Sequence, residues 1–123
     1  MDQWFNSQLQ RVQSRAGIDL KGCLVWQGGP YNITRYKYGA IRITNPMHGG
    51  ASKVEYVHRL VYQCANHLNQ LPEGLDVSHR CHNSHCVRED HLILEPHAVN
   101  LDRIQCELEG ECMGTHAPHC IFP

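Results

Sequence analysis

The clearest pattern along the chain is a helical one between residues 57 and 68. Apolar side chains recur there at intervals of three and four residues, at Val57, Leu60, Val61, Cys64, Ala65 and Leu68. This spacing predicts an amphipathic helix whose apolar stripe faces the core. We expect Cys64, which lies on the stripe, to be a small buried apolar residue and not a metal ligand. A weaker pattern of the same period predicts an N-terminal helical arm within residues 1–20.

Alternating residues predict β-structure between residues 23 and 58. In the segment 40–44, Ile41 and Ile43 would face one side of a strand, while Arg42 and Thr44 would face the other. A loop with Pro and Gly follows, and a return strand is expected at 53–57. Basic and hydrogen-bonding side chains on one face of such a ribbon can enter a DNA groove. A half-exposed antiparallel sheet without any ligand accounts for the pattern equally well.

The second half of the chain predicts an α+β arrangement of short elements. Strands are expected at 75–78 and 91–95, and a short helix at 97–105, directly after Pro96. The 123 residues suffice for one domain, so residues 1–123 are taken as a single unit. No apolar stretch is long enough to span a bilayer, and we expect no membrane partner. The first residues lack the pattern of a secretory signal, so an intracellular protein of cytoplasm or nucleus is expected.

Charge is distributed unevenly along the chain. Residues 1–60 carry eight Lys and Arg against three acids, a balance of +5, and residues 61–123 carry three against nine, a balance of −6. The first half could present a positive face to a polyanion. Solvated surface charge on both halves is an equally good explanation.

The 7 Cys and 10 His are unusual for this length and point to metal. An odd number of cysteines would leave one thiol outside a closed disulfide framework. In a reducing compartment such clusters favour zinc, which binds four nitrogen or sulfur ligands. The first cluster is Cys81-x4-Cys86-x4-His91, and Cys23 could complete its set of four.

The second cluster supplies a full set of ligands locally. It comprises Cys106, Cys112, His116 and Cys120. His119 competes with His116 for the fourth position. Since His119 is adjacent to Cys120, and neighbouring ligands strain the chelate, we favour His116. Both sites are expected to be structural and to replace the apolar core that this segment lacks.

Two further residues suit a reaction that the zinc-held scaffold could support. His79 lies two residues before Cys81, and Asn100 lies on the predicted helix between the clusters. A neutral histidine can accept a proton from water. The carbonyl oxygen of asparagine is a hard ligand that suits Mg²⁺ beside phosphate oxygens.

These residues form ordered motifs that resemble a known family. The motifs are Ser78-His79-Arg80-Cys81-His82-Asn83-x-x-Cys86, His91-Leu92, Asn100, Cys106 and Cys112. They resemble the His-Cys box homing endonucleases, members of the ββα-metal (His-Me finger) nucleases. Upstream motifs resemble phage HNH proteins: Cys23-Leu24-Val25-Trp26, Tyr38-Gly39, Val57-His58-Arg59 and Leu71-Pro72-Glu73-Gly74-Leu75. The resemblance covers residues 23–120.

The resemblance implies an antiparallel β ribbon and a ββα-metal nuclease motif, stabilised by two structural zinc sites. It places DNA contacts at 23–58, the catalytic ββα motif at 75–105 and a second zinc loop at 106–120. One Zn²⁺ would be bound by Cys23, Cys81, Cys86 and His91, and the other by Cys106, Cys112, His116 and Cys120. His79 would be the general base, and Asn100 would hold a catalytic Mg²⁺. The partners would be double-stranded DNA and a second copy of the chain in a homodimer.

The reaction that the resemblance implies is Mg²⁺-dependent, site-specific hydrolysis of DNA that leaves 5′-phosphate and 3′-hydroxyl ends. Many HNH relatives have a metal-binding Asp where this chain has Ser78, so Asn100 would be the protein's ligand to Mg²⁺. Arg42 and Arg103 are candidates to stabilise charge at the phosphorus. A phosphate-positioning or surface role for either arginine is equally compatible with the sequence.

Two other classes of function remain open at this point. A non-catalytic zinc module that binds nucleic acid or protein explains both clusters and the basic first half. It gives no reason for His79 and Asn100. A secreted disulfide domain would fit the glycosylation triplet Asn32-Ile33-Thr34, although such triplets are common by chance.

Overall fold

The computed structural model describes residues 2–28, 38–46, 49–114 and 116–121, and consists of helices and short strand pairs. Within the described residues, three antiparallel pairs form separate two-stranded sheets. Their strands are β1 (Ala16–Ile18) with β2 (Leu24–Trp26), β3 (Ala40–Thr44) with β4 (Ser52–Tyr56), and β5 (Leu75–His79) with β6 (Leu92–Pro96). The helices are α1 (Asp2–Gln13), α2 (Val57–Ala65) and α3 (His97–Glu109), with the short 3₁₀ helix η2 (Glu89–His91) before β6. The predicted α+β fold class is confirmed.

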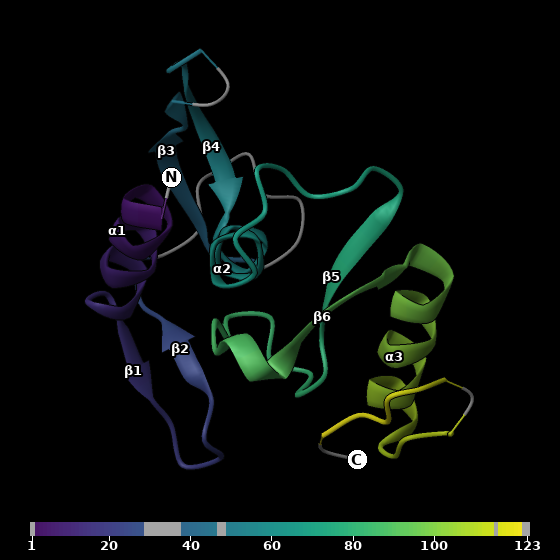
Figure 1. The fold of residues 1–123 in the computed structure, drawn as a ribbon. Helices are drawn as coiled ribbons and strands as arrows, with labels where there is room; N and C mark the ends of the chain where they lie inside the picture. Colours follow the sequence, from purple (N-terminus) through teal and green to yellow (C-terminus); the bar gives the residue numbers. More distant parts are fainter. Residues whose placement is uncertain (1, 29–37, 47–48, 115, 122–123) are drawn as a thin grey trace.

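Helix α2 lies at the centre of the molecule, with α1, the β3–β4 hairpin and the β5–β6 pair around it (Figure 1). Its apolar stripe is buried as the periodicity predicts, and Cys64 is fully buried in the core. The core collects residues from α1, β2, β3, α2, β5, the segment before η2, and β6: Phe5, Val12, Trp26, Ile41, Ile43, Val57, Leu60, Val61, Cys64, Val77, Val87 and Leu92. Each large apolar side chain that becomes fully buried contributes roughly 1.5–3 kcal/mol.

The N-terminal segment differs from the expected helical arm in its second part. Helix α1 ends at Gln13, and Ala16–Ile18 form strand β1, in which Ala16 pairs with Trp26 and Ile18 with Leu24. Pairing with β2 overrides the weak local preference, because the Asp19 carboxylate accepts hydrogen bonds from the backbone N–H of Lys21 and Cys23 and so stabilises a tight turn.

In strand β3 of the β3–β4 hairpin, the buried and exposed side chains are the predicted ones. Ile41 and Ile43 are buried, whereas Arg42 and Thr44 are exposed. Helix α1 covers the outer edge of β3, where Trp4 Nε1 donates to the Thr44 carbonyl at 3.0 Å and Arg11 Nη2 to the Arg42 carbonyl at 3.2 Å. Such contacts occupy edge carbonyls that would otherwise be free to pair with another strand. The upstream part of the predicted ribbon, including Asn32, lies outside the described residues.

The β5–β6–α3 unit matches the predicted ββα arrangement, with Ser78 opposite Ile93 and His79 opposite Leu92. Helix α3 is longer than expected, so Cys106 lies within the helix and not in the loop 106–120. The helix continues because no breaking residue occurs before Gly110, which adopts a left-handed conformation with φ 79° and ends it. None of the helices in the described part of the chain is both long and apolar enough to cross a bilayer.

Candidate metal centres and active site

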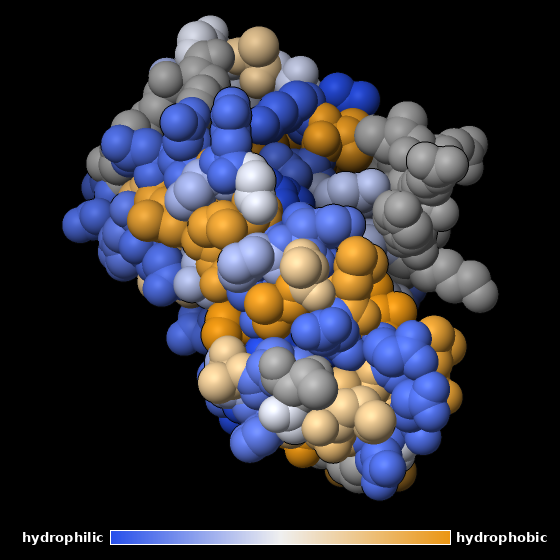
Figure 2. Space-filling model, turned by 90° about the vertical axis from the view of Figure 1, so that its right-hand side faces the viewer, coloured by the Kyte–Doolittle hydropathy of each residue, from blue (hydrophilic) through white to orange (hydrophobic). Residues whose placement is uncertain are grey.

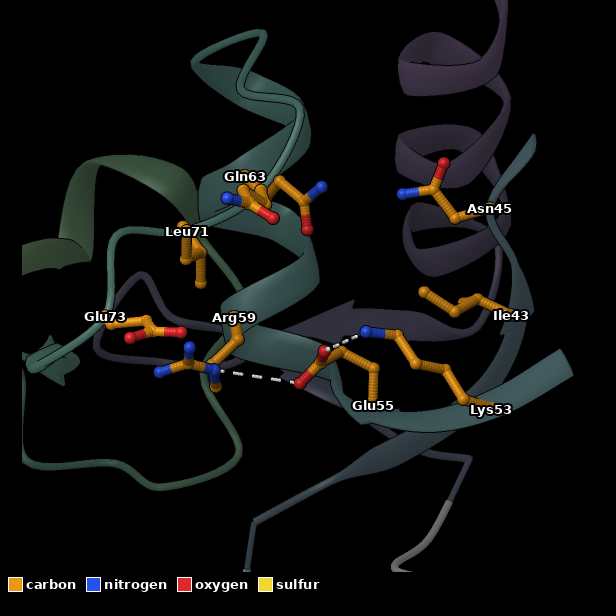
Figure 3. A pocket seen from close by; sticks show the side chains of 9 residues that line it. Ile43, Asn45, Lys53, Glu55, Arg59, Gln63, Leu71 and Glu73 are labelled. Atoms are coloured by element: carbon orange, nitrogen blue, oxygen red, sulfur yellow. Dashed lines mark ion pairs between the residues drawn. The ribbon is translucent and has the colours of Figure 1, made fainter. Parts of the chain in front are cut away.

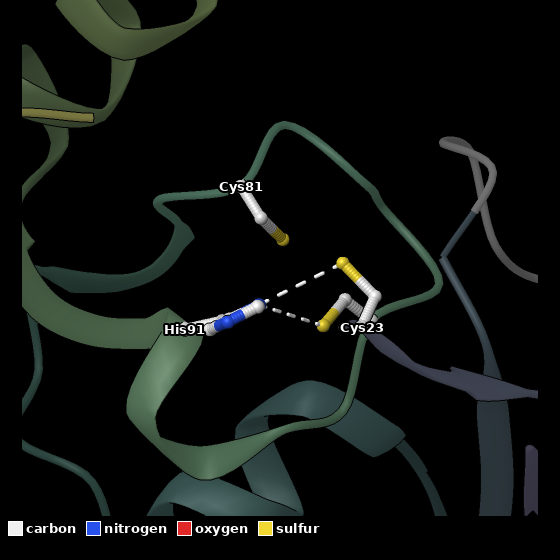
Figure 4. Close-up of side chains that lie close together, drawn as sticks. Cys23, Cys81 and His91 are labelled. Carbon is white, nitrogen blue, oxygen red and sulfur yellow. Dashed lines mark hydrogen bonds between the residues drawn. The ribbon is translucent and has the colours of Figure 1, made fainter. Parts of the chain in front are cut away.

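The first cluster has the dimensions of a tetrahedral zinc site. Cys23, Cys81, Cys86 and His91 are all buried, and their ligand atoms lie within 4.8 Å of one another. The sulfurs of Cys23 and Cys86 lie 3.6 and 3.5 Å from His91 Nδ1. Zinc–sulfur and zinc–nitrogen bonds at a tetrahedral angle would separate such atoms by roughly 3.5 Å. Figure 4 shows Cys23, Cys81 and His91 pointing toward a common centre.

Backbone pairing brings Cys23 to this cluster from a distant part of the sequence. Strand β2 docks beside the loop that carries Cys86, since Trp26 N–H donates to the His85 carbonyl at 2.8 Å and Val87 N–H to the Leu24 carbonyl at 2.7 Å. A metal held here would link the β1–β2 hairpin to the β5–β6–α3 unit. Because it closes a long segment of chain, the link would restrict the unfolded state strongly.

The second cluster also comes together, and it selects His116 over His119. The Nε2 atom of His116 lies 3.5, 3.9 and 3.7 Å from the sulfurs of Cys106, Cys112 and Cys120. The other ring nitrogen, Nδ1, donates to the Pro118 carbonyl at 2.9 Å, which leaves the Nε2 lone pair facing the sulfurs. His119 lies outside the group of four that converges.

Each cluster contains a thiol that ionises readily. A hydrogen bond from Cys81 lowers the pKa of the Cys86 thiol to about 5. In the second cluster, the backbone N–H of Cys120 lowers the pKa of the Cys112 thiol to about 6. The thiolate is the form that binds zinc. Burial raises the pKa of the Cys23 and Cys120 thiols, so each cluster has one readily formed thiolate and further thiols that a bound cation would have to ionise.

His79 is the last residue of strand β5, and a hydrogen bond to a backbone carbonyl fixes the tautomer of its imidazole ring. Its Nε2 lies 3.0 Å from the Cys86 carbonyl, which can only accept, so Nε2 carries the hydrogen and Nδ1 keeps a free lone pair. Burial lowers the pKa of His79 to about 4, so the ring is neutral near pH 7. The rings of Tyr38 and His58 pack against it, with centroids 5.7 and 4.7 Å away. Burial likewise holds the pKa of His58 well below its ordinary value.

Asn100 projects from the first turn of α3 toward strand β5. Its Oδ1 accepts a hydrogen bond from the Ser78 hydroxyl at 2.8 Å, and its Nδ2 donates to Asp76 Oδ2 at 3.0 Å. Asn100 and His79 line the same hollow, of about 60 Å³. The other residues that line it are Tyr38, His82, Ser84, Arg103, Ile104 and Glu107. The oxygen-rich surroundings of Asn100 suit a hard cation such as Mg²⁺.

The sequence of this chain matches a family model that bears on the function of these residues. A family model described as the zinc-binding loop region of homing endonuclease matches residues 27–123. The chain belongs to this His-Me finger homing endonuclease family. No curated protein and no solved structure matches it. The matched stretch starts after Cys23, so it contains three of the four residues of the first cluster and all four of the second.

Arg42 and Arg103 are placed differently in this homing endonuclease domain. Arg42 is exposed on the β3–β4 hairpin, where its Nη1 donates to Ser52 Oγ at 3.2 Å. Arg103 is 1% exposed and forms a two-pronged ion pair with Glu95, at 2.6 and 3.0 Å. It also donates to the Pro118 carbonyl at 2.9 Å. The burial of Arg103 favours a structural role, in which it links the Pro118 carbonyl to Glu95 of β6. A phosphate role for either arginine stays a prediction.

The Glu95–Arg103 pair gives a stability prediction. Glu95→Ala should lower the free energy of unfolding of the zinc-loaded protein by about 3–5 kcal/mol, because it leaves a buried guanidinium without its counter-charge. Denaturant titration would measure the change. Lys53→Ala removes the exposed half of the Lys53–Glu55 ion pair and should cost less than about 1 kcal/mol. Equal losses in the two variants would contradict the structural role of Arg103.

A second hollow, larger than the one lined by His79 and Asn100, lies beside the β3–β4 hairpin. That hollow, of about 300 Å³, lies between the hairpin and α2 (Figure 3). Its cations are matched by a carboxylate, since Glu55 lies 3.5 Å from Lys53 Nζ and 3.7 Å from Arg59 Nε. We therefore assign it no part in the reaction.

Sequence reasoning missed two residues that surround Asn100, namely Asp76 and His97. His97 Nδ1 donates to Asp76 Oδ2 at 2.6 Å, and the same oxygen accepts from Asn100. The period of two in strand β5 was a usable signal, because it places Asp76 on the same face as Ser78. The spacing of three residues between His97 and Asn100 was a second usable signal, because it places both side chains on one face of the helix.

Proposed function

We propose that this chain is a Mg²⁺-dependent endonuclease that hydrolyses phosphodiester bonds of double-stranded DNA at specific sites and leaves 5′-phosphate and 3′-hydroxyl ends. The observation that supports the proposal is the convergence of His79 and Asn100 on one hollow in a member of a homing endonuclease family. A zinc module with a binding role alone has no use for a neutral histidine of fixed tautomer beside an oxygen donor.

His79 acts as the general base in this proposal. The Nδ1 lone pair takes a proton from the attacking water, while the Cys86 carbonyl holds the opposite side of the ring in place. Cys86 is also a ligand of the first cluster, so a zinc bound there fixes the carbonyl that orients the base.

Asn100 Oδ1 is the oxygen that would hold Mg²⁺. When bound, Mg²⁺ supplies Lewis-acid stabilisation to the phosphate and to the departing 3′ oxygen. The Ser78 hydroxyl occupies one side of Oδ1, and a carbonyl oxygen has a second lone pair for a cation. The residues present therefore fit the metal.

DNA would contact the exposed face of the β3–β4 hairpin, which carries Arg42 in the positively charged first half of the chain. We further propose that the active form is a homodimer on a nearly palindromic site, since two-fold symmetric proteins bind symmetric DNA. A reducing intracellular compartment would keep the cysteines of both clusters available for zinc.

Incubation of the zinc-loaded protein with supercoiled plasmid tests the function. Cleavage that requires Mg²⁺, and yields ends that ligase rejoins, is expected. Metal analysis should find two zinc ions per chain. Two zinc ions without any cleavage would identify a non-catalytic binding module and overturn the proposal.

Replacing Asn100 by alanine should reduce Mg²⁺-dependent cleavage by about 100-fold or more, because the cation loses its protein oxygen. The rate of plasmid nicking as a function of Mg²⁺ concentration measures the effect. Asn66→Ala is a matched control, since the Asn66 amide only donates to the Tyr62 carbonyl at the end of α2. If Asn100→Ala lost zinc or unfolded, the role of Asn100 would be structural.

A further inference from the structure

An asparagine that binds a cation must present its oxygen and not its NH₂ group. The two ends of the carboxamide have nearly the same shape, and rotation about χ2 exchanges them at little steric cost. Something around Asn100 must therefore decide which end faces the cation. This inference rests on the proposed function, because it concerns the orientation of the proposed Mg²⁺ ligand.

The two hydrogen-bond partners of Asn100, Ser78 and Asp76, differ in how strictly they fix the orientation of its carboxamide. Ser78 can donate or accept through its hydroxyl, so it would tolerate either end of the carboxamide. Asp76 can only accept, so it requires the NH₂ group of Asn100 to face it. The observed contacts agree, with Nδ2 donating to Asp76 Oδ2 at 3.0 Å and Oδ1 accepting from Ser78 at 2.8 Å.

The Asp76 carboxylate is held by a second donor. His97 Nδ1 donates to the same Oδ2 atom at 2.6 Å, from the first residue of α3. The side chain of Asp76 is 30% exposed and that of His97 is 67% exposed, so the pair lies at the rim of the site. Asn100 and His97 approach Asp76 from one helix, and Asp76 and Ser78 project from one face of β5. The four side chains thus join the two elements of the ββα unit at the proposed metal ligand.

We propose that Asp76, held by His97, is a positioning residue that locks the Asn100 carboxamide with Oδ1 toward the catalytic cation. Asp76, His97 and Asn100 are not members of either zinc cluster, so their effect on Mg²⁺ can be measured separately from zinc binding. Loss of a residue that orients a metal ligand typically weakens metal binding or activity by 10- to 100-fold.

The test is Asp76→Asn, which keeps the shape of the side chain but can accept or donate toward Asn100. The Mg²⁺ concentration for half-maximal cleavage should rise about tenfold. Asp2→Asn is the matched control, because Asp2 forms a comparable exposed pair with His67, at 3.2 Å, outside the site. The control should leave the Mg²⁺ requirement unchanged. An unchanged requirement in Asp76→Asn would overturn the proposal.

The same Asp76→Asn change made in an Asn100→Asp variant separates an effect on the orientation of residue 100 from an effect on the stability of the fold. In Asn100→Asp, both ends of the side chain are oxygens, so orientation no longer matters. There, Asp76→Asn should leave the Mg²⁺ requirement unchanged or lower it, because it also removes repulsion between two carboxylates. A tenfold rise in both backgrounds would show a merely structural role for Asp76 and overturn the proposal.

The side-chain amide of Asn100 provides a readout without catalysis. In ¹⁵N-resolved NMR spectra, its signals are identified by their loss in Asn100→Asp. One Nδ2 proton should resonate downfield from the bond to Asp76 and move upfield in Asp76→Asn; absence of this movement would overturn the proposal. A chain that cleaved no DNA would end the proposed function alone, and the amide signals would still decide the orientation.

Discussion

His79→Ala is expected to abolish DNA cleavage, with a loss of about 10²–10⁴-fold or more, while both zinc ions and DNA binding are retained. The lone pair on Nδ1 is the group that accepts the proton from water, and alanine has nothing to replace it. The Cys86 carbonyl loses its hydrogen-bond partner, but the ligand atoms of the first cluster are not touched. Single-turnover cleavage of a labelled duplex, beside zinc analysis and a gel-shift titration, measures the three properties separately.

His67→Ala is the matched control for this variant, since His67 is exposed and pairs with Asp2 away from the hollow. His79→Gln guards against a packing artefact, because glutamine can still donate to the Cys86 carbonyl while it is a far weaker base. It should be as inactive as His79→Ala. Cleavage at the normal rate by either folded variant would reject His79 as the base.

Removal of zinc by a strong chelator is expected to release two zinc ions per chain and to unfold the chain after α3, which the second cluster holds. The binding of a structural zinc contributes on the order of 10 kcal/mol to folding. The apolar core is centred on α2, and none of the described residues at 110–114 and 116–121 belongs to it. Circular dichroism and NMR during chelation would follow the loss of structure. An apo protein that stayed folded would contradict the structural role of both clusters.

Single cysteine variants sharpen this prediction. Cys23→Ala should reduce the zinc content to one, because it removes one of the four ligands of the first cluster, while the backbone hydrogen bonds of Trp26 and Val87 still hold β2 in place. Cys64→Ala should keep two zinc ions, since Cys64 lies in the apolar core of α2. Loss of zinc in Cys64→Ala, or its full retention in Cys23→Ala, would show that the ligand assignment is wrong.

Local spacing in the sequence predicted the faces of α2 and β3 and the ligands of the second cluster, although the elements are short. The regular intervals of α2 and of β3 predicted which of their side chains are buried, because each element buries one face against the same core. The second cluster was predictable because its four ligands lie within one short segment. Cys23 could only be suggested by elimination and resemblance, since its position depends on the docking of β2 beside Cys86.

The remaining features depend on tertiary contacts that no local pattern encodes. Strand β1 has three residues, too few for a period, and forms because β2 pairs with it. From the sequence, Arg103 would be expected on the surface of its helix. In the structure it is buried, because it forms an ion pair with Glu95 of β6. Several apolar side chains of α3 are exposed, among them Leu101 and Leu108. Figure 2 shows the side of the molecule on which α3 lies, and hydrophobic and hydrophilic residues are mixed there.

The central claim is that two zinc-held segments present His79 and Asn100 to one scissile phosphate. Crystals of the zinc-loaded protein with an uncleavable DNA duplex and Mn²⁺ in place of Mg²⁺ would test it most directly through anomalous scattering. We predict zinc signals at both Cys₃His clusters, a manganese signal at about 2.2 Å from Asn100 Oδ1, and a DNA phosphate between that ion and His79. Manganese bound elsewhere, or a phosphate remote from His79, would contradict the account.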